Sequence, residues 1–509
     1  METKVATVKM RNITKRFGSV LANDRVWLNI YKGEVLALLG ENGSGKTTLM
    51  NMLSGIYFPD EGDIFINDEK VVIRSPKDAF DHGIGMIHQH FKLVDVLTAT
   101  ENIILGMEGK LDLKAAAEKI RQICDTYGFD VDPNQKIYDM SVSQKQTVEI
   151  VKVLFRGADI LILDEPTAVL TPQETDKLFA VLRNMRDDGK AIVIITHKMH
   201  EVEDLSDRVA ILRHGQFVGD MPTKATNAQE MTNMMVGYPV TLNIDRPDPI
   251  DSKPRVEVKG LTVRSIDGIL KLEDVSFTAM SGEILGVAGI SGSGQKELLE
   301  AIAGLQPVES GSICYVEDDG TRDELLGKDP LSIANKGIAL SFVPEDRLGM
   351  GLVGGMDLSD NMMLRSFRNG KSFFTDRKSP KRLAKQVVEE LHVKTPSIDT
   401  PVRKLSGGNV QKVLVGREIA SAPKVLLTAY AVRGLDINSS HTIYDLINQQ
   451  KQKGVAVIYV GEDLDVLLEL CDRILVLCAG KVSGIVPGKG AQKHDVGMMM
   501  TRLGGNKNA

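Results

Sequence analysis

A glycine-rich stretch near the N-terminus constrains the fold more than any other feature of the chain. Residues 40–47 read Gly-Glu-Asn-Gly-Ser-Gly-Lys-Thr and match the pattern G-x-x-x-x-G-K-[ST]. The apolar run Val35–Leu39 before them predicts a short buried strand, and Thr48–Leu53 after them predicts the start of a helix. Glycines let the backbone approach a bound group closely, and amides at a helix N-terminus attract anions. The stretch therefore predicts a phosphate loop that binds a nucleotide.

Individual residues of this loop have separate expected roles. The Lys46 ammonium is expected to reach the β- and γ-phosphates, and the Thr47 hydroxyl is expected to ligate Mg²⁺. A nucleotide and Mg²⁺ are therefore the expected cofactors, and the nucleotide is ATP if the family resemblance given below holds. The residues expected to surround the nucleotide are Gly40, Asn42, Gly43, Ser44, Gly45, Lys46, Thr47 and Thr48.

Composition excludes several other classes of function. The 509 residues carry a formal charge of −6, which argues against a general nucleic-acid binder. The first residues contain no apolar core of a signal peptide, and no apolar run approaches the roughly 20 residues that span a bilayer. Any role at a membrane is therefore expected to be peripheral. The four cysteines form no C-x-x-C pair, so we expect free, mostly buried thiols in a reducing compartment.

The chain repeats itself over a long distance. Gly40-x-x-Gly-x-Gly45 recurs as Gly289-x-x-Gly-x-Gly294, at an offset of 289 − 40 = 249. Asp207-Arg-Val-Ala-Ile-Leu recurs as Asp472-Arg-Ile-Leu-Val-Leu, at an offset of 472 − 207 = 265. The difference of 16 residues predicts insertions in the second copy, between residues 307 and 370. A period this long is too long for a solenoid and predicts two copies of a whole domain.

A polar, proline-marked segment separates the two copies. Residues 238–254 contain four prolines and read as a linker, with the boundary near residue 245. We therefore predict a first domain over 1–240, a linker over 241–254 and a second domain over 255–509.

Each half has the same predicted order of elements. In the first half, a β-rich opening from Val5 to Ala37 precedes the phosphate loop, and Leu113–Gly128 is predicted to be helical. The runs Ile160–Leu163 and Ala191–Ile195 are apolar throughout, which is typical of strands that are buried on both faces. The pattern predicts an α/β fold with a parallel sheet covered by helices.

Polar residues that follow apolar runs are further candidates for the site. Asp164 and Glu165 close one predicted strand, where Asp164 would hold Mg²⁺ and Glu165 would act as general base toward the attacking water. His197 follows a second strand and can contact the γ-phosphate, and Gln89 follows a third, where its amide can contact Mg²⁺ or the water. In isolation, such residues are more often a solvated acidic loop or a structural histidine or glutamine. Their place beside a complete phosphate loop favours the functional interpretation.

The order of these motifs resembles that of the ATP-binding cassette (ABC) ATPases. Leu405-Ser-Gly-Gly-Asn409-Val-Gln is similar to the signature sequence of that family. The resemblance covers essentially the whole chain twice. It implies two tandem P-loop domains, each with a β-rich subdomain, a mixed or parallel sheet core and a helical subdomain. Phe17 stands where the family often stacks an aromatic ring on adenine; a surface or core phenylalanine is the alternative interpretation.

The resemblance also implies that two cassettes pair head to tail, so that each nucleotide lies between one phosphate loop and the other cassette's signature. The first composite site is then complete. From the first half it takes Lys46, Thr47, Gln89, Asp164, Glu165 and His197, and from the second half Ser406, Gly407, Gly408 and Asp436.

The second composite site has lost nearly every such residue. It has Gln295 for the lysine, Lys296 for the threonine, Ala429 and Tyr430 for the two carboxylates, Glu462 for the histidine, Glu345 for the glutamine, Ser143 in a signature without glycines, and Thr171 for the aspartate that matches Asp436. Losing one electrostatic element typically costs about 10²–10³ in rate, so this site is expected to hydrolyse hardly any ATP. The defects collect in one composite site and spare the other, which supports pairing of the two halves.

A narrower resemblance concerns the tandem layout, the Gly294-Gln295 ending of the second loop and the sequence Val343-Pro-Glu-Asp-Arg347. These features are similar to fused ATPase subunits of bacterial carbohydrate and nucleoside importers, with the nucleoside branch favoured. The resemblance implies two transmembrane permease subunits, an extracytoplasmic substrate-binding protein or lipoprotein, a position on the cytoplasmic face of the membrane, and no nucleic-acid partner. The alternatives are a soluble tandem ABC ATPase of the translation-factor type and a regulatory nucleotide-binding module.

Overall fold

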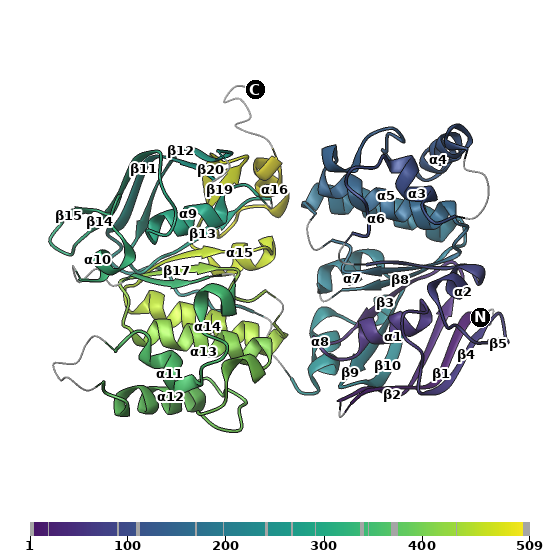
Figure 1. Cartoon of the computed structure of the whole chain (residues 1–509), viewed down its shortest axis with the longest axis horizontal. Coiled ribbons are helices and arrows are strands. Elements are labelled where there is room, and N and C mark those ends of the chain that lie inside the picture. The colour runs from purple at the N-terminus through teal and green to yellow at the C-terminus, as the bar shows by residue number, and fades with distance from the viewer. Residues whose placement is uncertain are drawn as a thin grey trace. The chain divides into compact units, whose positions relative to one another are not determined.

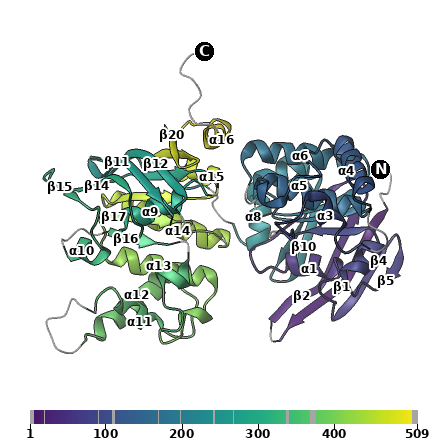
Figure 2. The same cartoon turned by 45° about the horizontal axis from the view of Figure 1, so that its top comes forward.

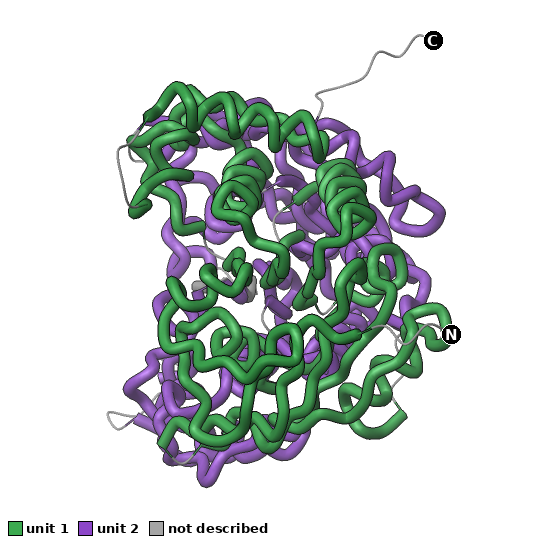
Figure 3. Tube along the Cα trace, turned by 90° about the vertical axis from the view of Figure 1, so that its right-hand side faces the viewer, with its two compact units in different colours: residues 1–242 green, residues 243–509 purple. Residues whose placement is uncertain are grey.

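The computed structural model divides the chain into two compact units, residues 1–242 and 243–509, which Figure 3 colours separately. The described residues are 5–18, 20–88, 91–107, 112–167, 170–196, 198–239, 243–265, 268–290, 292–335, 340–344, 346–367, 375–433 and 435–501. Each unit is an α/β assembly of two sheets and covering helices, which confirms the predicted fold class.

The first unit opens with a four-stranded antiparallel sheet. Its strands are β1 (Ala6–Phe17), β2 (Val20–Tyr31), β4 (Glu61–Ile66) and β5 (Glu69–Val71), in the order β2-β1-β4-β5. Alternate residues of β1, among them Val8 and Met10, are fully buried, because successive side chains of a strand point to opposite faces. This sheet packs one face onto the core beneath the phosphate loop.

A six-stranded sheet forms the centre of the first unit, in the order β10-β9-β3-β8-β7-β6. All its neighbours pair in parallel except the edge pair of β9 and β10. The bounds are β3 Val35–Leu39, β6 Ile84–Ile87, β7 Ile160–Asp164, β8 Ala191–Ile195, β9 Arg208–Arg213 and β10 Gln216–Pro222. The predicted strands at 35–39, 160–163 and 191–195 are confirmed.

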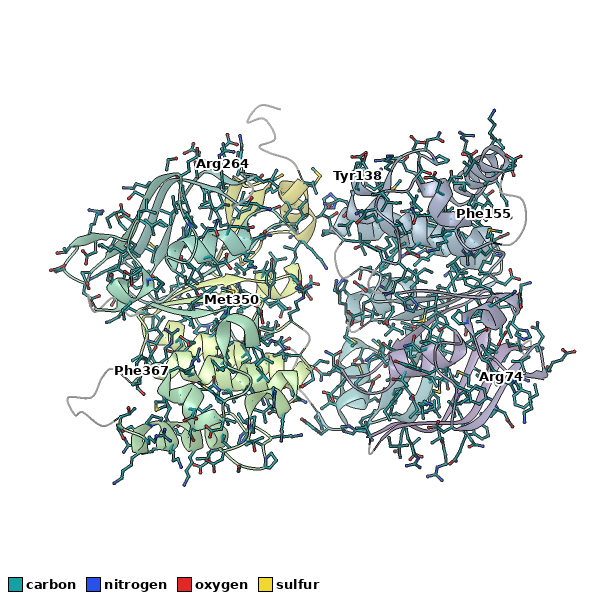
Figure 4. All side chains as sticks on the ribbon, viewed as in Figure 1. Arg74, Tyr138, Phe155, Arg264, Met350 and Phe367 are labelled. Carbon is teal, nitrogen blue, oxygen red and sulfur yellow. The ribbon has the colours of Figure 1, made fainter. Side chains whose placement is uncertain are left out.

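Helices cover both faces of this sheet, with α1 on one face and α5 and α6 on the other (Figure 1). A separate apolar cluster joins α3, α4 and α5, and Phe155 at the end of α5 belongs to it (Figure 4). The helix predicted over 113–128 is confirmed as α4, which Gly128 terminates in the left-handed conformation. The bounds are α1 Lys46–Leu53, α2 Pro76–Asp81, α3 Ala99–Ile104, α4 Leu113–Tyr127, α5 Val142–Phe155, α6 Pro172–Asp187, α7 Met199–Leu205 and α8 Ala228–Val236, with 3₁₀ turns η1 Ile137–Asp139 and η2 Thr223–Ala225.

The second unit repeats this architecture, with sheets in the orders β12-β11-β14-β15 and β16-β17-β18-β13-β19-β20. The strands are β11 Pro254–Arg264, β12 Leu270–Met280, β13 Ile284–Ala288, β14 Ser310–Val316, β15 Arg322–Glu324, β16 Leu340–Val343, β17 Val425–Ala429, β18 Ala456–Val460, β19 Arg473–Cys478 and β20 Lys481–Pro487. The helices are α9 Gln295–Ile302, α10 Pro330–Asn335, α11 Leu358–Met363, α12 Lys378–Glu390, α13 Gly407–Ala420, α14 Ile437–Gln452, α15 Leu464–Leu470 and α16 Lys493–Thr501, with a π-helical turn η3 Arg347–Gly351 and a 3₁₀ turn η4 Val402–Lys404.

Two apolar cores lie on opposite faces of the central sheet of the second unit. On β18, Val457 and Tyr459 pack into the core with α13 and α14, while Ile458 and Val460 pack into the core with α9. The two views of this layering in Figures 1 and 2 agree. The strand is apolar throughout because both of its faces are covered by other elements.

The segment before β11 is fastened to the second unit. Arg246 donates through Nη1 to the carbonyl oxygens of Leu468 and Cys471, at 2.8 and 2.7 Å, and Lys451 donates to the carbonyl of Pro247. The domain limits and the linker over 241–254 stay a prediction.

Two further observations bear on the sequence analysis. Across the described part of the chain, no helix has both the length and the apolar character to cross a membrane. All four cysteines are free, and Cys124, Cys471 and Cys478 are buried, as predicted.

Candidate functional site

The phosphate loop of the first unit joins β3 to α1, in the predicted order of strand, turn and helix. Gly45 caps α1 with a φ of 93°, a conformation that favours glycine. A Cβ atom on Gly45 would lie 2.3 Å from the carbonyl oxygen of Ala22, so no other residue fits there. The start of α1 has no side-chain cap and no acidic residue in its first turn. Its backbone amides are therefore available to an anion.

Lys46 folds back over its own loop. Its Nζ donates to the carbonyl oxygens of Gly40 and Glu41, at 2.6 and 2.9 Å, and the side chain is almost completely buried. Burial lowers the pKa of Lys46, while the nearby carboxylates, Glu165 first, act in the opposite direction. A phosphate group entering the loop would offer the ammonium a stronger, charged acceptor than these carbonyls.

Asp164 ends β7 beside the first turn of α1. Its Oδ2 accepts a hydrogen bond of 3.1 Å from the Thr47 hydroxyl, so the two expected metal ligands lie together. Burial raises the pKa of Asp164, as does the charge of Glu165, while the bond from Thr47 and the charge of Lys46 lower it. A hydroxyl and a carboxylate are oxygen donors of the kind that Mg²⁺ takes, so this pair fits the ion.

Glu165 follows directly and has a φ of 49°, which is rare for a residue other than glycine. Its backbone amide donates to the carbonyl of Ile195 at the end of β8, at 2.9 Å. Such backbone conformations typically cost about 1–3 kcal/mol and persist at functional sites. This geometry holds Glu165 at the ends of two neighbouring strands, beside Lys46 and Asp164.

The structure gives fewer contacts for the other predicted residues. Gln89 and His197, and Glu345 in the second unit, lie outside the described residues. Asn42 and Gly43 are exposed at the loop, Thr48 is half-buried, and Ser44 is buried with its hydroxyl oxygen unpartnered in the described structure. Phe17 is 42% exposed at the end of β1 and meets Tyr57 edge-on, with ring centres 5.2 Å apart. Its contact with adenine stays a prediction.

The sequence analysis missed Asn23, which supports the phosphate loop. Asn23 is fully buried on β2, and its Nδ2 donates to the carbonyl oxygen of Gly45 at 3.2 Å. The other buried positions of β2 are Val26, Leu28 and Ile30, so a polar amide in this series is the sequence signal that could have revealed it.

The second unit keeps the backbone conformation of the site but has other side chains at the positions of the lysine, threonine and carboxylates. The Nε2 of buried Gln295 donates to the carbonyl of Ile290 at 3.2 Å, five positions back, as Lys46 does to Glu41. Lys296 pairs with Glu300 at 3.9 Å. Tyr430 has a φ of 51°, and its amide donates to Val460 at 2.9 Å, which repeats the backbone of Glu165 without the carboxylate.

The two helices that follow the signature positions start differently. In the first unit, Ser141 and Gln144 form a capping box at the start of α5, so the helix satisfies its own first amides. In the second unit, α13 starts after Ser406 without any side-chain cap, and the Ser406 hydroxyl instead accepts a bond of 2.8 Å from Asn409. The start of α5 therefore has two of its amides bonded by side chains, those of Ser141 and Gln144, whereas no side chain caps the start of α13.

The segment after β16 in the second unit contacts the start of α13. Arg347 in η3, whose position Met350 marks in Figure 4, donates to the carbonyl of Gly407 at 3.5 Å and to the carbonyl of Arg433. It thereby joins the start of α13 to the loop before Asp436, which caps α14. The sequence Val343-Pro-Glu-Asp-Arg347 marked this segment, but these contacts could not be read from it.

Comparisons with known proteins identify the family of the chain. The family model described as ABC transporter matches residues 23–168 and 272–428. The nucleoside import ATP-binding protein NupA of Lactococcus lactis subsp. cremoris is 41% identical, over 98% of this chain and 99% of its own length. The guanosine import ATP-binding protein NupO of Bacillus subtilis is 38% identical, over 97% of each chain.

A third relative and one solved structure complete the comparison. The glucose import ATP-binding protein TsgD13 of Haloferax volcanii is 37% identical, over 98% of this chain and 96% of its own length. The solved complex of archaeal ribosomal stalk protein aP1 with the ribosome recycling factor aABCE1 is similar with a TM-score of 0.61 and 16% identity, over 94% of this chain and 90% of that one. The last likeness shows the fold alone. The chain belongs to the ABC transporter family, as an ATPase subunit that carries two cassettes in one polypeptide.

Proposed function

We propose that this ATPase subunit powers the import of a nucleoside, with a sugar as the second possibility, and that it hydrolyses ATP at one composite site. The relatives named for nucleoside and guanosine import, at 41% and 38% identity, favour the nucleoside over the sugar. The observation that carries the one-site proposal is the asymmetry of the chain. Lys46, Thr47, Asp164 and Glu165 surround the loop of the first unit, whereas Gln295, Lys296, Ala429 and Tyr430 occupy the matching positions of the second.

The starts of the signature helices support the same asymmetry. The uncapped amides of α13 are suited to grip the γ-phosphate of a nucleotide held by Lys46. At the start of α5, the Ser141–Gln144 capping box occupies the amides of these two residues, so fewer amides are left for a phosphate. We infer that the nucleotide of the first phosphate loop is completed by Ser406, Gly407, Gly408 and Asp436 of the second unit.

The residues of this composite site divide the chemistry between them. Lys46 leaves the carbonyls of Gly40 and Glu41 and binds the β- and γ-phosphates. Thr47 and Asp164 would hold Mg²⁺, which would neutralise phosphate charge. Glu165 orients and polarises the attacking water, the Gln89 amide contacts Mg²⁺ or that water, and His197 contacts the γ-phosphate. Closure on ATP and reopening after hydrolysis then drive the transport cycle.

The partners follow from the family membership and the relatives' roles. We propose two transmembrane permease subunits that dock near Gln89 and Glu345, an extracytoplasmic substrate-binding protein, and a position at the cytoplasmic face of the membrane. The alternative of a translation-factor ATPase has weaker support, because the resemblance to aABCE1 is one of fold alone.

Variants in the reconstituted transporter test this proposal. Lys46→Ala and Glu165→Gln are each expected to reduce steady ATP turnover and uptake at least about 10²-fold, because each removes one electrostatic element of the reacting site. Gln295→Ala, at the lysine position of the second loop, is the matched control and is expected to keep most of the turnover. Full uptake by either first-unit variant, or near-complete loss in Gln295→Ala, contradicts the one-site proposal.

A second measurement addresses the transported molecule. The reconstituted transporter is offered radiolabelled nucleosides and, separately, ribose and glucose at equal concentration. We expect ATP-dependent uptake of a nucleoside. Uptake of a sugar alone contradicts the nucleoside assignment and leaves the one-site proposal intact.

A further inference from the structure

A buried carboxylate outside the motifs lies beside the site of the first unit. Glu201, on the first turn of α7, is only 2% exposed. Its Oε1 accepts a hydrogen bond from the Thr167 hydroxyl, and its Oε2 accepts one of 2.9 Å from the Thr196 hydroxyl. Both threonines are also buried. The Nζ of Lys198 lies 3.3 Å from Oε1, so the buried negative charge is paired as well as hydrogen-bonded.

The two threonines flank the proposed catalytic residues. Thr167 comes two positions after Glu165, and Thr196 comes one position before His197. Lys198 makes two further hydrogen bonds to these threonines. Its backbone amide donates to the Thr196 hydroxyl at 3.1 Å, and its Nζ donates to the Thr167 carbonyl at 3.3 Å. Glu201 therefore joins the chain leaving β7, at Thr167, to the chain leaving β8, at Thr196.

The second unit shows that the fold does not need this group. At the established offset of 265, Thr167 matches Val432, Thr196 matches Gly461 and Glu201 matches Val466. The backbone around it is nevertheless retained, because β17 and β18 pair in parallel and Tyr430 donates to Val460 as Glu165 does to Ile195. The polar cluster is present where the catalytic residues are present and absent where they are lost.

A different buried ion pair is present in both units, unlike the Glu201 cluster. Glu34 pairs with Arg208 at 2.7 Å in the first unit, and Glu283 pairs with Arg473 at 2.5 Å at the matching place in the second. Glu34 is as buried as Glu201, at 3% exposed. Because this pair recurs in both units, it belongs to the shared fold, and Glu34 provides a matched control for Glu201.

We propose that Glu201 is a positioning residue for ATP hydrolysis, which aligns Glu165 and His197 through the Thr167 and Thr196 hydroxyls. The inference rests on the proposed roles of those two residues. The carboxylate oxygens of Glu201 bind the two threonines, so its proposed effect on the reaction is indirect. Glu201 fixes two strand exits relative to each other, and a displacement of about 1 Å at such a site costs about 10²-fold in rate.

Steady-state kinetics of the full chain in its transporter test this role. Glu201→Gln and Glu201→Val are expected to lower kcat about 10- to 100-fold, while KM for ATP stays within about threefold, because the phosphate loop is untouched. Glu34→Gln, with the same loss of one buried charge, is expected to lower the unfolding temperature without lowering kcat. Equal kcat in Glu201→Gln and the wild type overturns the proposal.

A double-mutant cycle separates positioning from a general loss of stability. If Glu201 acts through Thr196, Thr196→Val lowers kcat by itself, and the double variant Thr196→Val, Glu201→Gln is no slower than the slower single one. Multiplicative losses, or a loss of kcat that parallels the unfolding temperature across all variants, overturn the proposal. Glu165→Gln is measured alongside. If that variant keeps its turnover, the proposed catalytic site itself fails, whereas an inactive Glu165→Gln beside a fully active Glu201→Gln rejects this inference alone.

Discussion

Single residues of this chain change their environment between two copies of one backbone. Gln146 on α5 and Gln411 on α13 occupy matching positions, at an offset of 411 − 146 = 265. The Nε2 of Gln146 donates to the carbonyl of Pro166, whereas both side-chain polar atoms of fully buried Gln411 are without a partner in the described structure. An unsatisfied buried polar group typically costs about 1–3 kcal/mol. We therefore expect the side-chain amide of Gln411 to lower the stability of the second unit.

Substitution by methionine, which has nearly the same length and volume, tests this difference. Gln411→Met is expected to raise the free energy of unfolding of the second unit by about 1–3 kcal/mol, because it removes an unsatisfied amide. Gln146→Met is the matched control and is expected to give no gain, because it also removes a bond that is made. Scanning calorimetry measures both. Equal stabilisation by the two variants would show that the hydrogen bond of Gln146 makes no difference.

At the scale of elements, helix starts distinguish the two units more clearly than helix lengths do. Helices α5 and α13 both contain 14 residues and begin at matching positions. The first caps itself through Ser141 and Gln144, and the second does not. Capping stabilises a helix, but it occupies the amides that a phosphate would use. The cap is therefore expected where the signature has lost its glycines, and the open start where the signature is intact.

This contrast predicts opposite effects of the same substitution. Ser141→Ala is expected to lower the stability of the first unit by about 1 kcal/mol, because a capping bond is lost, and to leave turnover unchanged. Ser406→Ala is expected to leave stability nearly unchanged and to lower ATP turnover, because Ser406 is proposed to bind the nucleotide. Thermal unfolding and steady-state ATPase assays measure the two quantities. The reverse pattern, with turnover sensitive to Ser141 and indifferent to Ser406, contradicts the assignment of the composite sites.

At the scale of the whole molecule, the chain consists of two units with separate cores. Arg246 and Lys451 tie the connecting segment to the second unit. Such a chain is expected to unfold in two steps, and a ligand that binds only the folded state raises the transition of the unit that it contacts.

Nucleotide binding to the Glu165→Gln chain therefore reports on pairing of the two cassettes. With Mg-ATP at about 100 times Kd, binding adds about 2.7 kcal/mol, and we expect both transitions to rise if the nucleotide binds at the proposed composite site. Lys46→Ala is the control in which neither transition rises. A shift of the first transition alone would mean that Ser406, Gly407 and Gly408 do not complete the site.

Much of the fold and of the candidate site could be predicted, because the relevant motifs are formed by contiguous residues. The phosphate loop between β3 and α1, the carboxylates at the end of β7 and the duplicated order of strands and helices all depend on local patterns, and the structure has these elements at the predicted places. The roles of Gln89 and His197 stay predictions from the sequence. The asymmetry of the two sites was also visible at once, because it requires only an alignment of one half with the other.

What the tertiary structure alone decided are contacts between residues far apart in sequence. Asn23 reaches Gly45 across 22 positions, Thr167 reaches Glu201 across 34, and Arg347 reaches Gly407 across 60. None of these polar residues belongs to a periodic pattern that predicts its partner, because a hydrogen bond depends on the distance and direction that strand pairing and helix packing impose. The sequence alone is enough to predict which half of the chain has the residues for ATP hydrolysis. Only the packing of the strands and helices shows which buried polar side chains, such as Asn23 and Glu201, contact the segments that carry those residues.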